Sequence, residues 1–202
     1  MKIIQLEAKT IEEAKQEAVK ELRVPKEHIE ITVLEKKGLM RKVLICEAKV
    51  TKDPAEVGYE LLTQTLERME IEAVVEMRKK NKNEIEYSVN TSENPILIGK
   101  NGKTLESMQF YLRHVVNNYS DERQIVLLDI GGYKQNRKRQ LEIIATKTAK
   151  EVARSRVEAK LRPMNAYERR IIHTKLAEWR DVTTISEGEG QDRHLVIKPK
   201  RK

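Results

Sequence analysis

Two glycines three positions apart, Gly99 and Gly102, lie between two segments that are predicted to be helices. Such a turn lets a ligand approach the backbone closely, because neither glycine carries a Cβ atom. The free amides at the start of the second helix favour an anion, and Lys100 and Lys103 add positive charge. The spacing therefore predicts a phosphate site, with an ordinary turn between two helices as the alternative.

Arg169 and His173 are four residues apart in a segment predicted to be helical, so they share one face of that helix. The planar guanidinium group can bind a phosphate through paired hydrogen bonds or stack on a base, and a histidine can stack or donate. This pair is compatible with nucleic-acid binding. The alternative is a surface arginine beside a histidine whose hydrogen bonds are made within the fold.

A third cluster follows the pair Gly131-Gly132, which separates a strand from a helix. The helix opens with Tyr133, Lys134 and Arg137. Cations in the first turns of a helix oppose its dipole, which favours anions there. The arrangement suggests an anionic ligand, and a tyrosine beside a cation offers a stacking platform. A solvated helix face with carboxylate partners such as Glu142 is the alternative.

The charge of the chain is distributed unevenly along its length. Residues 131–202 contain 19 Lys and Arg against 9 Asp and Glu, whereas residues 1–130 contain 21 against 23. The whole positive excess therefore falls in the last third. Such asymmetry indicates an anionic partner at that end, either a nucleic acid or a membrane surface.

Several classes of protein are disfavoured by what the sequence lacks. Cys46 is the only cysteine, which excludes a disulfide framework. No apolar run approaches the roughly 20 residues that span a bilayer, and the first residues do not begin a secretory signal. We expect a cytoplasmic chain that does not span the membrane. No metallopeptidase, nucleotide-loop or nucleophile motif occurs, so we expect no catalytic residue, no metal site, no cofactor and no enzyme activity.

The hydrophobic pattern predicts an α+β chain of three small domains. Residues 1–50 form a βαββ unit that turns at Lys36-Lys37-Gly38, and residues 54–130 form an αββααβ unit with a strand at 70–79. In residues 131–202 helices pack on a small antiparallel sheet. There a long joining helix runs from Tyr133 to Leu161, and a second helix ends near Trp179. Strands cover 182–185 and 194–197, residues 186–190 form a loop, and residues 198–202 form a basic tail.

The glycine turn, in its αββααβ setting, makes residues 54–130 resemble a type II KH domain. In that family the turn clamps the backbone of about four unpaired nucleotides, and the bases lie in an apolar groove. The resemblance assigns the RNA contacts to Leu97, Ile98, Gly99, Lys100, Asn101, Gly102 and Lys103. Leu105 is a further groove candidate, with a place in the core between the two helices as its alternative.

The run from Arg162 to His173, followed by Thr184–Gly190, resembles the Arg-xxx-His domain, a single-stranded nucleic-acid module, over about residues 140–200. The resemblance adds Arg193 and the Ser-Glu-Gly loop to the candidate site. The full set of candidate contacts in this part of the chain is Tyr133, Lys134, Arg137, Arg169, Arg170, His173 and Arg193.

The order of the three domains resembles the Jag family over essentially the whole chain. That resemblance implies a bacterial protein that binds single-stranded RNA, or single-stranded DNA, as an RNA chaperone or post-transcriptional regulator linked to cell elongation and envelope homeostasis. It also implies pairing with a smaller KH-only protein or with a second copy, and contact with a membrane insertase. The alternative is an insertase adaptor in which RNA binding is secondary.

Overall fold

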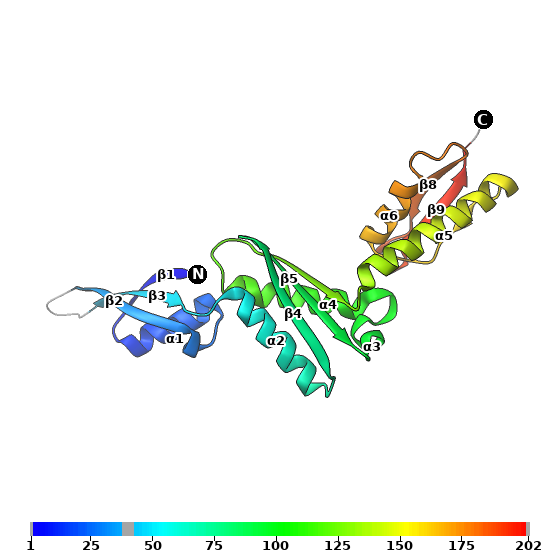
Figure 1. Ribbon diagram of the computed structural model, residues 1–202. Helices are drawn as coiled ribbons and strands as arrows, with labels where there is room; N and C mark the ends of the chain where they lie inside the picture. The colour runs from blue at the N-terminus through cyan, green and yellow to red at the C-terminus, as the bar shows by residue number, and fades with distance from the viewer. Residues whose placement is uncertain (1, 38–42, 201–202) are drawn as a thin grey trace. The chain divides into compact units, whose positions relative to one another are not determined.

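The structure of the chain, a computed structural model, describes residues 2–37 and 43–200 (Figure 1). The chain is α+β, as predicted, and it forms two compact units, Met1–Gly131 and Gly132–Lys202. Within the described residues, no helix is both long enough and apolar enough to cross a bilayer.

The first unit begins with the predicted βαββ order. Its elements are β1 (Ile3–Ala8), α1 (Ile11–Leu22), the short 3-10 helix η1 (Lys26–His28), β2 (Ile29–Lys37) and β3 (Val43–Val50). The side chain of Thr10 caps α1 by accepting a hydrogen bond from the Glu13 amide. The three strands form an antiparallel sheet in the order β1-β3-β2, and α1 buries Ala14, Ala18 and Leu22 in the core beneath it. Gly38, the end of the predicted turn, lies outside the described residues.

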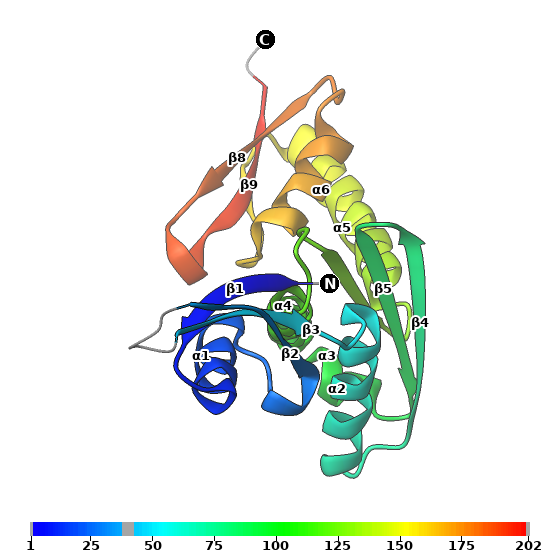
Figure 2. The same cartoon turned by 90° about the vertical axis from the view of Figure 1, so that its left-hand side faces the viewer.

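The same unit continues with the predicted αββααβ order. Its elements are α2 (Pro54–Arg68), β4 (Ala73–Asn81), β5 (Glu84–Thr91), α3 (Asn94–Ile98), the short 3-10 helix η2 (Lys100–Gly102), α4 (Lys103–Asn118) and β6 (Ile125–Ile130). The sheet order is β4-β5-β6, antiparallel between β4 and β5 and parallel between β5 and β6. Helices α2 and α4 pack against each other and on the sheet (Figure 2). The strand predicted at 70–79 begins at Ala73 instead, because residues 69–72 form the turn that follows α2.

A tyrosine fixes the distance between α2 and β5. Tyr87 is fully buried, and its hydroxyl group donates to the Ala55 carbonyl oxygen over 2.9 Å. A Cβ atom on Gly58 would lie 2.2 Å from that hydroxyl oxygen, so this helical position has no room for a side chain. Burial, together with the nearby Asp53 carboxylate, raises the pKa of Tyr87 far above its usual value.

The two halves of the first unit share part of one core. Val57 of α2 and Tyr119, which follows α4, belong to the same buried cluster as Leu22 and Cys46. The Tyr119 hydroxyl group and Nδ1 of His28 form a hydrogen bond of 2.8 Å. Residues 1–50 and 54–130, predicted as separate domains, therefore lie within one compact unit.

The second unit consists of α5 (Tyr133–Ser155), β7 (Ala159–Lys160), α6 (Ala166–Leu176), β8 (Val182–Glu187), the short 3-10 helix η3 (Gly190–Asp192) and β9 (His194–Pro199). Its antiparallel sheet has the order β7-β9-β8. Both helices pack on this sheet and on each other around a core that includes Leu141, Ala145, Ile172 and Ile197.

Several predicted bounds in the second unit were wrong. The long helix ends at Ser155 rather than Leu161, because Arg156 adopts a left-handed conformation with φ of 61°. The chain then pairs with β9 through β7, a strand that the sequence did not predict. Helix α6 ends at Leu176, before Trp179. Ser186 and Glu187, placed in a loop by the sequence, are the last residues of β8, and Lys198 and Pro199, placed in the tail, are the last residues of β9.

Candidate nucleic-acid interface

The glycine turn, Gly99–Gly102, connects α3 to α4 through a left-handed backbone. The φ angles of Gly99, Asn101 and Gly102 are 69°, 55° and 77°. Gly99 has ψ near 180°, a combination that only glycine adopts without strain. A Cβ atom at Gly99 would also lie 2.1 Å from Oγ1 of Thr104. The turn therefore requires glycine at this position for both conformational and steric reasons.

The turn presents cations beside the free end of a helix. No side chain caps α4, whose N-cap residue is Gly102. The amides of Gly102 and Lys103 donate to the carbonyl oxygens of Gly99 and Lys100 within the turn, so an anion would meet the amides that follow them. Lys100, Asn101 and Lys103 are exposed. This geometry is compatible with a phosphate group, and phosphate binding at the turn stays a prediction.

The apolar side chains exposed beside the glycine turn differ from those predicted to line the groove. Leu97 is fully buried and Leu105 nearly so, which places both in the core and leaves no surface for a base. Their assignment to the groove was wrong, and the core alternative holds for Leu105. Ile98 is half-buried, and Ile96 is exposed. Ile96 and Ile98 are therefore the apolar side chains of α3 that a ligand can reach.

An aromatic platform on α4 was missed by the sequence reasoning. Phe110, the only phenylalanine of the chain, is 64% exposed, and Cζ of Arg113 lies 5.5 Å from the centre of its ring. An aromatic ring with a cation beside it suits base stacking. Phe110 follows Lys103 by seven residues, so the two share a helix face. That spacing was the available signal.

Arg137 and Glu168 connect the two helices of the second unit. Nε of Arg137 donates to Oε1 of Glu168 over 2.6 Å, and the carboxylate is buried. Arg137 was predicted to contact nucleic acid, and the alternative for its cluster was a solvated helix face with carboxylate partners such as Glu142. In the structure at least one of its donors holds α5 to α6, so its first role is to position these helices.

The Arg-xxx-His pair also makes contacts within the unit. Nη1 of Arg169 donates to the Met164 carbonyl oxygen over 2.7 Å, which ties α6 to the segment before it. His173 forms a hydrogen bond through Nδ1 to the hydroxyl group of Thr184 on β8. His173 nevertheless remains exposed and Arg169 half-buried. Both side chains are held in place and still reach solvent, which is the state a binding residue needs.

The other candidates of the second unit lie at its surface. Lys134, Arg170 and Arg193 are exposed, and Tyr133 is half-buried. The Arg193 carbonyl oxygen accepts the amide of Met164, so the segment tied by Arg169 also meets the end of the β8–β9 loop.

The predicted Ser-Glu-Gly loop is tied to β9 by a charged pair. Nζ of Lys198 donates to Oε1 of Glu187 over 2.7 Å. This hydrogen bond lowers the pKa of Glu187 below its usual value. Glu187 is therefore engaged within the hairpin.

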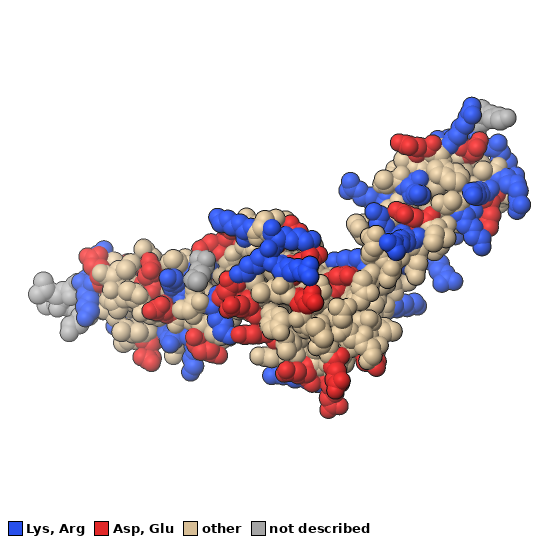
Figure 3. Space-filling model, in the orientation of Figure 1, with Lys and Arg blue, Asp and Glu red and all other residues tan. Residues whose placement is uncertain are grey.

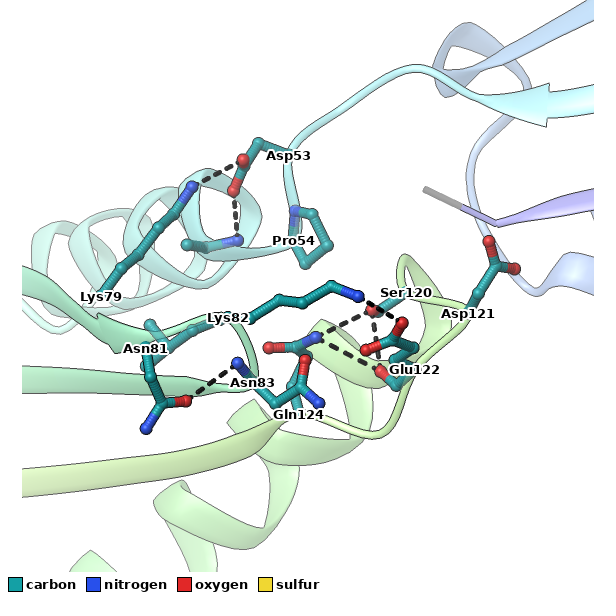
Figure 4. A pocket seen from close by; sticks show the side chains of 12 residues that line it. Asp53, Pro54, Lys79, Asn81, Lys82, Asn83, Ser120, Asp121, Glu122 and Gln124 are labelled. Carbon is teal, nitrogen blue, oxygen red and sulfur yellow. Dashed lines mark hydrogen bonds and ion pairs between the residues drawn. The ribbon is translucent and has the colours of Figure 1, made fainter.

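A polar pocket of about 380 Å³ lies in the first unit, where the start of α2, the β4–β5 turn and the segment before β6 meet (Figure 4). Its lysines are bound by its own carboxylates, Lys79 to Asp53 over 2.7 Å and Lys82 to Glu122 over 2.6 Å. Burial would raise the pKa of Asp53, but hydrogen bonds from Lys79 and the Ala55 amide outweigh it and lower that pKa. The pocket adjoins the carboxyl end of α4, and the glycine turn adjoins the amino end.

No group of three or more metal-binding side chains gathers among the residues that the structure describes.

The comparisons with known proteins cover both units. The Jag N-terminus family matches residues 6–42, and the R-3-H (Arg-xxx-His) domain family matches residues 139–199. An RNA-binding protein KhpB of Clostridium symbiosum is 36% identical over 208 residues, which span all of this chain and 93% of that relative. The chain belongs to the Jag (KhpB) family. Another KhpB, from Bacillus subtilis (strain 168), is 30% identical over 209 residues that span the whole of both chains.

Membership of the Jag family confirms the resemblance drawn from the order of the domains. The Arg-xxx-His domain match covers Arg169, His173 and Arg193, and it begins at Arg139, after the glycine pair and the first turns of α5. A third KhpB, from Lactiplantibacillus plantarum, is 35% identical over 107 residues, which span 53% of this chain and 33% of that relative.

Proposed function

We propose that this chain is a bacterial RNA-binding protein that holds single-stranded RNA at two sites, one in each compact unit, and does not cleave it. The observation that carries the proposal is the glycine turn, with three left-handed residues and two exposed lysines at the uncapped start of α4. The Arg-xxx-His domain match and the full-length relatives, themselves named RNA-binding proteins, support the same function.

At the first site the backbone, rather than a base, is bound. A phosphate group approaches the turn because Gly99 and Gly102 have no side chain, and the amides of α4 donate to it. Lys100 and Lys103 neutralise neighbouring phosphates. Unpaired bases then rest on the accessible apolar side chains of α3 and on Phe110. We propose residues 54–130 as a KH domain on this basis.

At the second site Arg169 and His173 provide a phosphate contact and a stacking surface from one face of α6. Arg170 and Arg193 add positive charge at the same unit's surface. Because the two sites belong to one chain, binding at one raises the local concentration of RNA at the other. Two weak sites then give an affinity that neither reaches alone. Binding of this kind would suit an RNA chaperone or post-transcriptional regulator.

The experiment measures binding of a labelled single-stranded RNA, with a matched single-stranded DNA and an RNA duplex, across a salt series. One variant changes Lys100 and Asn101 to Asp, and its control changes Lys20 and Gln16 of α1 to Asp, with the same change in charge at exposed positions. A second variant changes Arg169 and His173 to Ala, with Lys175→Ala on the same helix as its control.

We expect both site variants to lose at least tenfold in affinity for single-stranded RNA and both controls to lose little. The RNA should be recovered intact after long incubation with magnesium or manganese. Absence of binding by the unaltered chain would contradict the proposal. Equal losses in the Asp variant and its α1 control would contradict the assignment of the glycine turn.

A further inference from the structure

The side of α5 that faces away from the core carries a row of exposed side chains. We call it the outer stripe, and it consists of Asn136, Arg139, Gln140, Ile143, Lys147, Lys150 and Arg154. Successive members are three or four residues apart, apart from the neighbours Arg139 and Gln140, so they follow one side of the helix. The opposite side buries Leu141, Ala145, Ala149 and Val152. Figure 3 shows Lys and Arg side chains along the part of the surface that α5 forms.

The charge of the outer stripe is mainly positive. It holds four cations, and the exposed Glu151, four residues from Lys147 and three from Arg154, is the one carboxylate at its edge, whereas Glu142 lies farther from its axis. Among the described residues of this unit, the ion pairs use Arg137 and Lys198 and none of the cations of the stripe. Four cations on one helix face, none of them in an ion pair of this unit, favour a polyanion as ligand.

The first turns of α5 are a different surface. Lys134 and Lys138 are exposed at positions on the side of α5 that farther along buries Leu141 and Ala145, and Arg137 reaches Glu168. Of the cations that open α5, only Arg139 continues into the outer stripe. The stripe is therefore a separate feature from the cluster that the sequence indicated.

The shape of the stripe favours a nucleic acid over a membrane. A helix that lies in a bilayer surface needs a broad apolar face, but the apolar face of α5 is used in the core. Within the stripe the only apolar side chain is Ile143, which is 67% exposed. From Arg139 to Arg154 the stripe extends about 22 Å along the helix. Such a narrow row of cations matches the backbone of one strand.

We propose that the outer stripe of α5 binds the phosphate backbone of RNA, as a third contact surface beyond the glycine turn and the Arg-xxx-His pair. This inference rests on the proposed function. It places RNA on the side of α5 that is turned away from α6, because α6 packs against the buried side. RNA contacts of the second unit then continue beyond the Arg-xxx-His pair.

The test changes Lys147, Lys150 and Arg154 to Gln and measures affinity for a labelled single-stranded RNA between low and moderate salt. Each lost phosphate contact lowers the slope of log affinity against log salt by about 0.7. We therefore expect the slope to fall by about 2 and the affinity at low salt to fall at least tenfold. The control changes Lys9, Lys20 and Lys26 of the first unit to Gln, an equal change in net charge, and its slope should stay near that of the unaltered chain.

A second variant keeps the charge and changes Lys147 and Lys150 to Arg. It should keep the slope, and fluorescence of Trp179, the only tryptophan, reports whether each variant retains the fold of the second unit. If the unaltered chain binds RNA and the Gln variant keeps its slope, the stripe proposal is overturned and the proposed function stands. If the unaltered chain binds no RNA, both fail. Loss of binding to phosphatidylglycerol vesicles with an unchanged RNA slope would assign the stripe to a lipid surface and overturn the proposal.

Discussion

Arg137 of α5 donates to Glu168 of α6 over 2.6 Å, and only 4% of Glu168 is exposed. The backbone amide of Glu168 is in turn bound by the side chain of Asn165, which caps α6. The residue beside Glu168 in the sequence is Arg169. The pair thus fixes the helix that presents the Arg-xxx-His residues.

Replacing Glu168 with Ala should destabilise the second unit by about 2–3 kcal/mol, because it leaves the partly buried guanidinium group of Arg137 without its partner. The measurement is urea unfolding followed by Trp179 fluorescence. The control is Glu178→Ala at an exposed position, which should change the unfolding free energy by less than about 0.5 kcal/mol. Equal stability of the two variants would contradict the structural role of the pair.

Gly99→Ala should weaken RNA binding at least tenfold, because the new methyl group meets Thr104 in a backbone conformation that only glycine adopts easily. The matched control is Gly190→Ala. Gly190 also has positive φ, of 53°, but nothing lies within 4 Å of an added Cβ atom. Titration with labelled RNA, alongside circular dichroism, checks both. Unaltered affinity in the Gly99→Ala variant would show that the turn does not clamp the ligand.

Thr184→Val removes the hydroxyl group that holds His173 while keeping the shape of the side chain. A histidine that is free to rotate must be ordered when RNA binds, and this ordering costs conformational entropy. We therefore expect RNA binding to weaken about threefold to tenfold. Thr183→Val, at an exposed position of the same strand, is the control. A loss confined to Thr184→Val would be expected. Identical affinities for the two variants would show that the hydrogen bond does not matter for binding.

Acid should remove the contribution of Asp53 to the stability of the first unit. The pKa of Asp53 is lowered in the folded chain, so the ionised carboxylate stabilises the fold above the unfolded pKa, near 3.8. This contribution is lost as the pH falls through the folded value. Asp53→Asn should therefore be less stable than the unaltered chain at pH 7 and approach it once the pH has fallen below the folded pKa. Amide hydrogen exchange of α2 measures the difference, and a gap that persists in acid would contradict the argument.

The sequence predicted the order of most elements because their apolar residues recur with clear periods. The last strand of the predicted αββααβ unit is β6, where Val126, Leu128 and Ile130 alternate and are buried. The end of α5 could not be predicted in this way. Arg156 adopts a left-handed conformation that nothing in its residue type favours, and β7 exists only through pairing with residues almost 40 positions later.

The candidate site was predicted where the chemistry is local and missed where it depends on tertiary contacts. The glycine turn needs only two glycines and its flanking helices, so its geometry follows from the spacing. The partner of Arg137 is 31 residues away, and no local pattern connects them. Leu97 was wrongly assigned to a groove because its apolar character fits a core and a groove equally well. Only its burial distinguishes the two.

The fit between Gly58 and Tyr87 constrains how this fold can change over evolutionary time. A single substitution of Gly58 by any larger residue would collide with the Tyr87 ring, whereas loss of the tyrosine would leave a void between α2 and β5 and an unpaired Ala55 carbonyl oxygen. Neither position is free to drift alone. Across relatives we expect correlated change, with alanine or serine at position 58 only where a smaller side chain occupies position 87. An engineer redesigning this layer would have to alter both residues in one step.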